Sequence, residues 1–227
     1  MRTKRSGLNS VFCAAYAALV LLTSLWLGTA SGQSIDARYA SMSASVRAAL
    51  SAAVRDHTNS RPSSLTQNPG YAHWQQKMST RLSHWIADPS QREELLSLVY
   101  YESRRAGLEP QLVLSVIEVE SGFRKYAISH ANARGYMQVM PFWIQVIGRE
   151  GDNLFHIRTN LRYGCTILRH YLDLEEGNLV RTLARYNGSL GQTWYPKRVE
   201  RAWQRHWTYE PVIDVADTSS NLPIYGP

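Results

Sequence analysis

The chain has 227 residues, of which 44% are hydrophobic, and it carries a formal net charge of +7. This length supports one substantial hydrophobic core but hardly two. The basic residues are scattered rather than gathered into a nucleic-acid-binding motif, and no cysteine–histidine spacing indicates a metal site, so neither of these two classes is favoured.

Residues 1–30 have the features of an export signal. A basic start (Arg2, Lys4 and Arg5) precedes an uncharged apolar stretch over 11–27, and small residues follow it. Removal of this segment would leave a net charge of +4, which suits an anionic polymer such as a cell wall. We therefore expect a periplasmic protein. Because the apolar stretch is long for a cleaved signal, an uncleaved inner-membrane anchor is the alternative.

The flanking regions differ in composition from the centre of the chain. Residues 31–70 are rich in Ser and Ala and lack large apolar side chains, which predicts a linker or a weak helical appendage, with a short helix over 44–54. Residues 211–227 contain several prolines and are predicted to form a loose tail.

Between residues 71 and 210 apolar residues recur at helical intervals, and no segment alternates as a half-buried strand would. Asp88-Pro89 is a typical helix start, and Gly107 a typical helix end. Helices are predicted over about 74–86, 89–107, 110–120, 161–174, 180–186 and 198–207. The sequence thus indicates an all-α domain of about 140 residues.

Glu120 is the most informative residue of this domain. In a helix it shares a face with Ile117, Val116 and Val113, all residues of the buried type. Burial makes a carboxylate costly to ionise and raises its pKa towards neutrality, which is the state a general acid needs near pH 7. The structural alternative is a carboxylate that ends the helix and pairs with Arg124 or Lys125.

Other residues are weaker candidates for a catalytic group. Glu118 shares its helix face with both polar and apolar residues and is the alternative acid. Asp152 is the nearest later carboxylate, but it stands in a polar turn and is interpreted as a solvated loop residue. Cys165 falls within an apolar helical pattern and is interpreted as a core residue rather than a nucleophile.

Three segments, in order, carry a family resemblance. They are Glu-Ser-Gly-Phe at 120–123, the loop from Ser129 through Gly135-Tyr136-Met137-Gln138-Val139-Met140-Pro141, and Ala-Arg-Tyr-Asn-Gly at 184–188. Together they resemble the catalytic domain of the soluble lytic transglycosylases, whose all-α lysozyme-like fold is shared with goose-type lysozyme. The resemblance covers essentially the whole helical domain.

The resemblance implies cleavage of the β-1,4 bond between N-acetylmuramic acid and N-acetylglucosamine in peptidoglycan. The glutamate that matches Glu120 would protonate the glycosidic oxygen and then act as base towards the muramoyl 6-hydroxyl, giving a 1,6-anhydro end. One carboxyl group that changes role replaces the pair used by most glycosidases.

The resemblance also implies a set of substrate-binding positions. Ser121 would bind substrate or close the helix, and Met140 would line the site or pack in the core. The full set is Ser121, Ser129, Gln138, Met140, Tyr186 and Asn187. Tyr136 departs from the family's usual leucine and would either add a stacking surface or fill space. Beyond Gly188 the match is loose, and the aromatic residues there are interpreted mainly as core.

Two alternative functions share these residues. A muramidase of the same fold would use water in place of the internal hydroxyl, and a non-catalytic peptidoglycan-binding or secretion-accessory module would lack the chemistry. The expected partners are peptidoglycan glycan strands, with cell-wall or secretion machinery as further candidates. No nucleic acid, metal or organic cofactor is implied, and a membrane is implied only if the N-terminal segment is retained.

Overall fold

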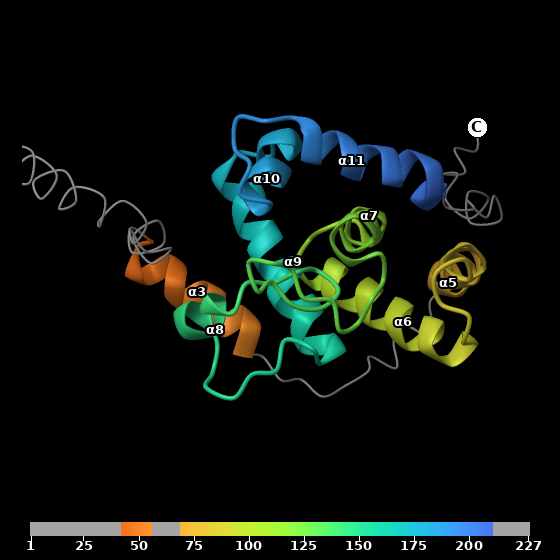
Figure 1. Ribbon diagram of the computed structural model, residues 1–227, viewed down its shortest axis with the longest axis horizontal. Coiled ribbons are helices and arrows are strands. Elements are labelled where there is room, and N and C mark those ends of the chain that lie inside the picture. The colour runs from red at the N-terminus through yellow and green to blue at the C-terminus, as the bar shows by residue number, and fades with distance from the viewer. Residues whose placement is uncertain (1–41, 56–68, 211–227) are drawn as a thin grey trace, which may run out of the picture. The chain divides into compact units, whose positions relative to one another are not determined.

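The computed structural model describes residues 42–55 and 69–210 (Figure 1). The predicted export signal and the predicted tail lie outside these residues. Within the described ranges, no helix combines the length and the apolar character needed to cross a membrane. The chain divides into two units after Ala44, and apart from the first residue of α3 the helices below belong to the unit that begins at Ser45.

Helices account for the regular structure of the described residues, whose only extended pairings are the isolated bridges Ile128–Arg134 and Arg134–Val139. The elements are α3 (Ala44–Arg55), α5 (Pro69–Leu82), α6 (Pro89–Arg105), α7 (Pro110–Ser121), α8 (Phe142–Ile147), α9 (Ile157–Leu174), α10 (Leu179–Tyr186), α11 (Trp194–Ala202) and the π-helical turn η1 (Trp203–Trp207). The all-α class predicted from the sequence is therefore confirmed.

Local sequence signals fix several helix ends. Asp88 accepts a hydrogen bond from the Ser90 amide at 2.9 Å, with Pro89 at the first helical position of α6. Gly107, just beyond the end of α6, has φ +65°. The predicted extent of α5 was wrong, because the helix ends at Leu82 and Trp85 lies in the turn that follows.

The last predicted helix was also misplaced. We expected it to begin near Arg198, but α11 begins at Trp194 and continues into η1. Pro196 obscures this start in the sequence because proline is usually a helix breaker. In the first turn of a helix its missing N–H costs nothing, so α11 accommodates it there.

Helix α7 is the centre of the core. Every residue from Pro110 to Ile117 is buried, and the helix packs against α6, α11 and η1. In Figure 1 it is viewed nearly along its axis. A helix that is apolar on all sides must be surrounded by other elements, and α7 is. Its C-terminal turn, which carries Glu120, is the part that emerges from this packing.

Helix α9 supports the loop that joins α7 to α8. Asn160 accepts a hydrogen bond from the Met137 amide at 2.8 Å and donates to the Arg134 carbonyl at 2.8 Å. Gly164 lets the fully buried Met137 approach closely, since a Cβ at this position would lie 2.3 Å from the Met137 sulfur. The loop is therefore packed against a rigid element.

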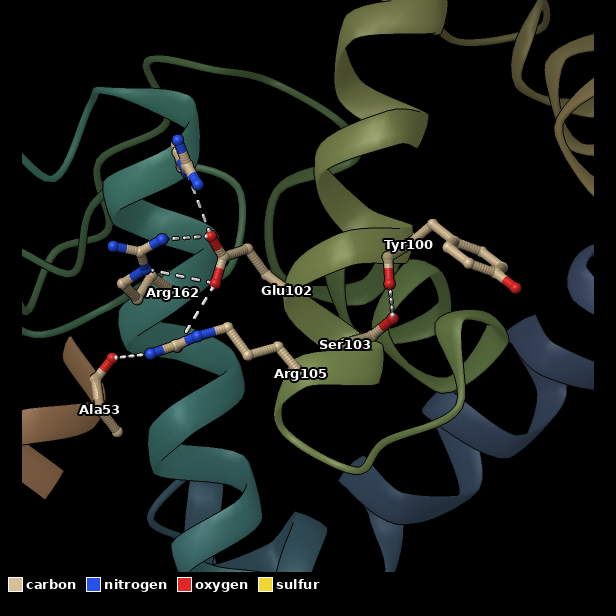
Figure 2. Close-up of polar contacts among 7 residues, drawn as sticks. Ala53, Tyr100, Glu102, Ser103, Arg105 and Arg162 are labelled. Atoms are coloured by element: carbon tan, nitrogen blue, oxygen red, sulfur yellow. Dashed lines mark hydrogen bonds and ion pairs between the residues drawn. The ribbon is translucent and has the colours of Figure 1, made fainter. Parts of the chain in front are cut away.

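A buried ion-pair cluster joins α6 to α9 (Figure 2). Glu102 is 1% exposed and accepts a hydrogen bond from Arg162 at 2.8 Å, and Arg162 is itself 4% exposed. Arg158 and Arg105 also pair with this carboxylate, at 3.4 and 3.7 Å. Arg105 in addition donates to the carbonyl of Ala53 at 2.6 Å, which links the cluster to α3.

The short helix predicted over residues 44–54 is confirmed as α3. Val54 is 3% exposed, Ser51 donates to the Ile147 carbonyl, and Arg55 donates to the Gly148 carbonyl, each at 2.9 Å. Helix α3 is thus fastened near the end of α8. The domain boundaries drawn in the sequence stay predictions.

Candidate functional site

Glu120 lies in the last turn of α7, where Gly122 ends the helix in the left-handed conformation with φ 56°. Its side chain is partly exposed, and burial raises the pKa of Glu120 to about 7. A hydrogen bond from Tyr195 and the positive charge of Arg198 act in the opposite direction and are outweighed. The raised pKa predicted from the sequence is confirmed.

Tyr195 holds the Glu120 carboxyl group in place. Its hydroxyl donates to Oε1 of Glu120 at 2.6 Å, and the ring is 1% exposed. Tyr195 and Arg198 both come from α11 and lie one turn apart, so one helix supplies both groups that favour the ionised acid. We had interpreted Tyr195 as a core aromatic and carried over no residue from this region, so the sequence analysis missed it.

Replacement of Tyr195 by phenylalanine is expected to raise the pKa of Glu120 further, by about one unit. A hydrogen bond to a charged group is worth roughly 1.5–3 kcal/mol, and its loss penalises the ionised carboxylate. Titration of the Glu120 carboxyl carbon by NMR measures the change. In Arg198→Met, the matched control for the charge alone, we expect a smaller rise, and a pKa that falls in Tyr195→Phe would contradict this role.

The two alternative carboxylates, Glu118 and Asp152, form hydrogen bonds that organise the fold. Glu118 accepts hydrogen bonds from the Trp207 indole at 2.7 Å and the His206 ring at 3.0 Å, and so fastens η1 to α7. Asp152 accepts from the Tyr163 hydroxyl at 2.5 Å and from the Arg149 amide at 3.0 Å. Both bonds organise the turn before α9, so Asp152 is a structural loop residue.

Tyr186, the last residue of α10, interacts electrostatically with Glu120. Its hydroxyl donates to the Met137 carbonyl at 2.8 Å. Burial raises the pKa of Tyr186 well above its usual value, and the negative charge of Glu120 adds to this rise. Asn187 follows as the C-cap of α10 and is partly exposed. The structure therefore places α7, α10 and α11 around the acid.

Two predicted residues shape the loop between α7 and α8. The Ser129 hydroxyl accepts a hydrogen bond from the Ala133 amide at 3.1 Å. Gln138, with φ 48°, donates through its side-chain amide to the carbonyls of Ala127 and Gly135 at 3.1 and 3.0 Å. Both side chains are partly exposed and thus combine a loop-forming role with access to solvent.

The remaining residues singled out in the sequence differ in how exposed they are to solvent. Ser121 is 1% exposed and donates to the Ile117 carbonyl at 3.1 Å, so the geometry favours the helix-closing alternative over substrate contact. Met140 is partly exposed, whereas Tyr136 is 6% exposed and fills space rather than forming a stacking surface. Cys165 is buried with a raised pKa, as expected for a core thiol.

A pocket lies away from these residues. An apolar pocket of about 500 Å³ is lined by α10, α11 and η1, with Val180, Leu183 and Trp203 among its walls. It contains none of the predicted site residues.

Comparison with models of protein families matches residues 97–206 to the Transglycosylase SLT domain. Segments of known proteins are also similar. The chain is 52% identical over 48 residues to the membrane-bound lytic murein transglycosylase C of Actinobacillus pleuropneumoniae, and 54% identical over 46 residues to that of Mannheimia succiniciproducens. These matches span 21% and 20% of this chain, and in each case 13% of the relative.

Among solved structures, the 70 kDa soluble lytic transglycosylase of Escherichia coli matches 65% of this chain and 31% of its own, with 18% identity and a TM-score of 0.33. The three motifs, from Glu120 to Gly188, lie within the segment that the family comparison matches. Residues 97–206 of this chain therefore form a Transglycosylase SLT domain.

Proposed function

We propose that this protein is a peptidoglycan lytic transglycosylase, which cleaves the bond between N-acetylmuramic acid and N-acetylglucosamine. Glu120 is the catalytic acid and then the base. The observation that carries the proposal is the Glu120 carboxyl group in the last turn of α7, held by the Tyr195 hydroxyl at 2.6 Å. Burial raises the pKa of this group to about 7, which leaves a substantial protonated fraction at neutral pH. The family match and the names of the relatives support the same reaction.

The reaction needs one carboxyl group and no water. Protonated Glu120 gives its proton to the glycosidic oxygen while the bond from that oxygen to the muramoyl anomeric carbon breaks. The Glu120 carboxylate then takes the proton of the muramoyl 6-hydroxyl, whose oxygen bonds to the same carbon. A 1,6-anhydro ring closes, the acid is regenerated, and atoms and charge balance.

Tyr195 suits both stages of this cycle. Its hydroxyl, 2.6 Å from the carboxyl group, stabilises the carboxylate that exists between the two proton transfers. Burial favours the protonated acid before the first transfer. The opposing influences keep the pKa close to neutrality, where both proton transfers are accessible.

The proposed setting is the cell envelope. The relatives are named as membrane-bound murein enzymes, and this chain begins with a basic and then apolar segment typical of export. Partners are therefore the glycan strands of the wall. Residues Ser129, Gln138, Met140, Tyr186 and Asn187 are the proposed substrate contacts.

Mass spectrometry of the products released from purified sacculi tests the proposal. We expect disaccharide-peptide fragments that end in 1,6-anhydromuramic acid, each lighter by one water than the product of hydrolysis. Products with a reducing muramic acid would instead identify a muramidase. If no soluble fragment is released although the protein binds sacculi, the non-catalytic binding module is the correct assignment.

A further inference from the structure

Two large apolar side chains on the loop after α7 are strongly exposed. Tyr126 is 70% exposed and Ile128 is 63% exposed, the two highest values among the large hydrophobic residues that the structure describes as exposed. Single exposed apolar residues are common on protein surfaces, but a contiguous set indicates a contact surface. Whether Tyr126 and Ile128 form a contact surface therefore depends on the residues around them.

We call Tyr126, Ile128 and the neighbouring Phe155 the aromatic platform. The ring centroids of Tyr126 and Phe155 are 6.0 Å apart. Ile128 pairs with Arg134 in an isolated bridge, and the Arg134 guanidinium lies 5.8 Å from the Phe155 ring centroid. Lys125 lies 5.4 Å from the Tyr126 ring centroid. Two cations thus border an apolar surface.

The aromatic platform continues the proposed active site along the chain. Tyr126 follows the C-terminal turn of α7, which carries Glu120, and Ser129 lies just beyond Ile128. Ala127 lies between Tyr126 and Ile128, and its carbonyl accepts a hydrogen bond from the Gln138 side chain at 3.1 Å. The loop after α7 therefore carries Tyr126 and Ile128 together with Ser129 and Gln138, two of the proposed substrate contacts.

We propose that the aromatic platform binds a sugar of the glycan strand away from the bond that is cleaved, while Lys125 and Arg134 pair with the free carboxylates of its stem peptide. This rests on the proposed function. An exposed aromatic ring offers an apolar face to the C–H face of a sugar, and the two cations match an acidic substituent that a neutral glycan lacks. The substrate class is thus a murein strand that still carries its peptides.

Sedimentation with insoluble sacculi tests the proposal in a Glu120→Gln background, where binding is separated from cleavage. Addition of Tyr126→Ala is expected to weaken binding roughly two- to tenfold, because an aromatic contact with the sugar is lost. Leu174→Ala is the matched control, since Leu174 is 54% exposed on α9 and outside the aromatic platform. We expect this control to bind as its parent does.

A separate experiment tests the two cations, Lys125 and Arg134. Lys125→Ala with Arg134→Gln is expected to weaken binding several-fold to intact sacculi at low salt, and to have no effect on strands stripped of their peptides. Tyr126→Ala should weaken binding to both substrates. Equal binding by Tyr126→Ala and its parent would overturn the proposal, as would an equal effect of the charge variants on both substrates.

Failure of this proposal is distinguishable from failure of the proposed function. If the wild type releases anhydro products and Tyr126→Ala binds normally, the aromatic platform is refuted and the enzyme stands. If the wild type releases nothing but binds sacculi through Tyr126, the platform stands and the catalytic assignment fails.

Discussion

Replacement of Glu120 by glutamine is expected to lower the rate of muropeptide release by roughly 10²–10⁴-fold, the usual worth of a general acid or base. Glutamine keeps the size of the side chain and an oxygen that accepts the Tyr195 hydroxyl proton, but it has no proton to give to the glycosidic oxygen. The release of soluble fragments from sacculi, followed over time, measures the effect.

Glu118→Gln is the matched control for this loss. Glu118 lies two positions earlier on the same helix, and the amide oxygen of glutamine still accepts the Trp207 indole proton. We expect cleavage to persist in this variant. The assignment of the acid is wrong if Glu118→Gln abolishes cleavage and Glu120→Gln does not.

The same Glu120→Gln change is expected to stabilise the fold at high pH. Because the folded pKa of about 7 exceeds the ordinary value of 4.5, the folded protein holds this proton more tightly than the unfolded chain. The contribution of this bound proton to the free energy of unfolding is therefore present below pH 4.5, falls as pH rises to 7, and stays low above pH 7. Glutamine does not ionise, so the variant does not lose this stability at high pH.

The gain in the free energy of unfolding should reach about 3 kcal/mol at pH 8–9 and vanish near pH 4. Urea unfolding of both proteins across this pH range measures it. A pH-independent difference between the two would show that Glu120 ionises in the folded protein as it does in water. An active-site group that costs stability is common, because function and not folding selects it.

The local sequence predicted the position of Glu120 because the relevant information is local. The helical repeat places the buried residues Val113, Val116 and Ile117 on its face, and burial is what raises the pKa of Glu120. The loop between α7 and α8 was likewise recognisable from its motif, although only the structure shows that Tyr136 in this loop and Ser121 at the end of α7 are buried.

Tyr195 was beyond the reach of this reasoning. It meets Glu120 across 75 residues of chain, and nothing in its own neighbourhood marks its hydroxyl as a partner of an acid. Its helix was misplaced as well, since Pro196 concealed the start of α11. Periodicity predicts which face of a helix is buried, whereas the pairing of two polar groups depends on how distant helices pack.

The cluster around Glu102 was missed for the same reason, and its removal is expected to have the largest effect on stability. In Glu102→Ala the free energy of unfolding should fall by about 3–5 kcal/mol, because the 4%-exposed Arg162 loses the carboxylate that compensates its charge. For a chain of this size the melting temperature should fall by roughly 10 °C. Thermal and urea unfolding measure both quantities.

The control is an ion pair at the surface. Glu109 lies 3.7 Å from Arg104 with both side chains about 60% exposed, so Glu109→Ala should change stability by less than about 1 kcal/mol. An equally small effect of Glu102→Ala would show that the buried cluster does not stabilise the junction between α6 and α9.

A double variant separates the charge from the packing. Glu102→Leu with Arg162→Met removes the buried charge together with its partner and keeps similar volumes, so stability should return close to that of the wild type. Arg105 and Arg158, whose side chains are 21% and 22% exposed, have access to water. Because α9 also carries Asn160 and Gly164, which support the Met137 loop beside Tyr186, muropeptide release should recover in parallel with stability. A double variant that stays as unstable as Glu102→Ala would mean that the shape of the Glu102 side chain, and not its charge, holds the two helices together.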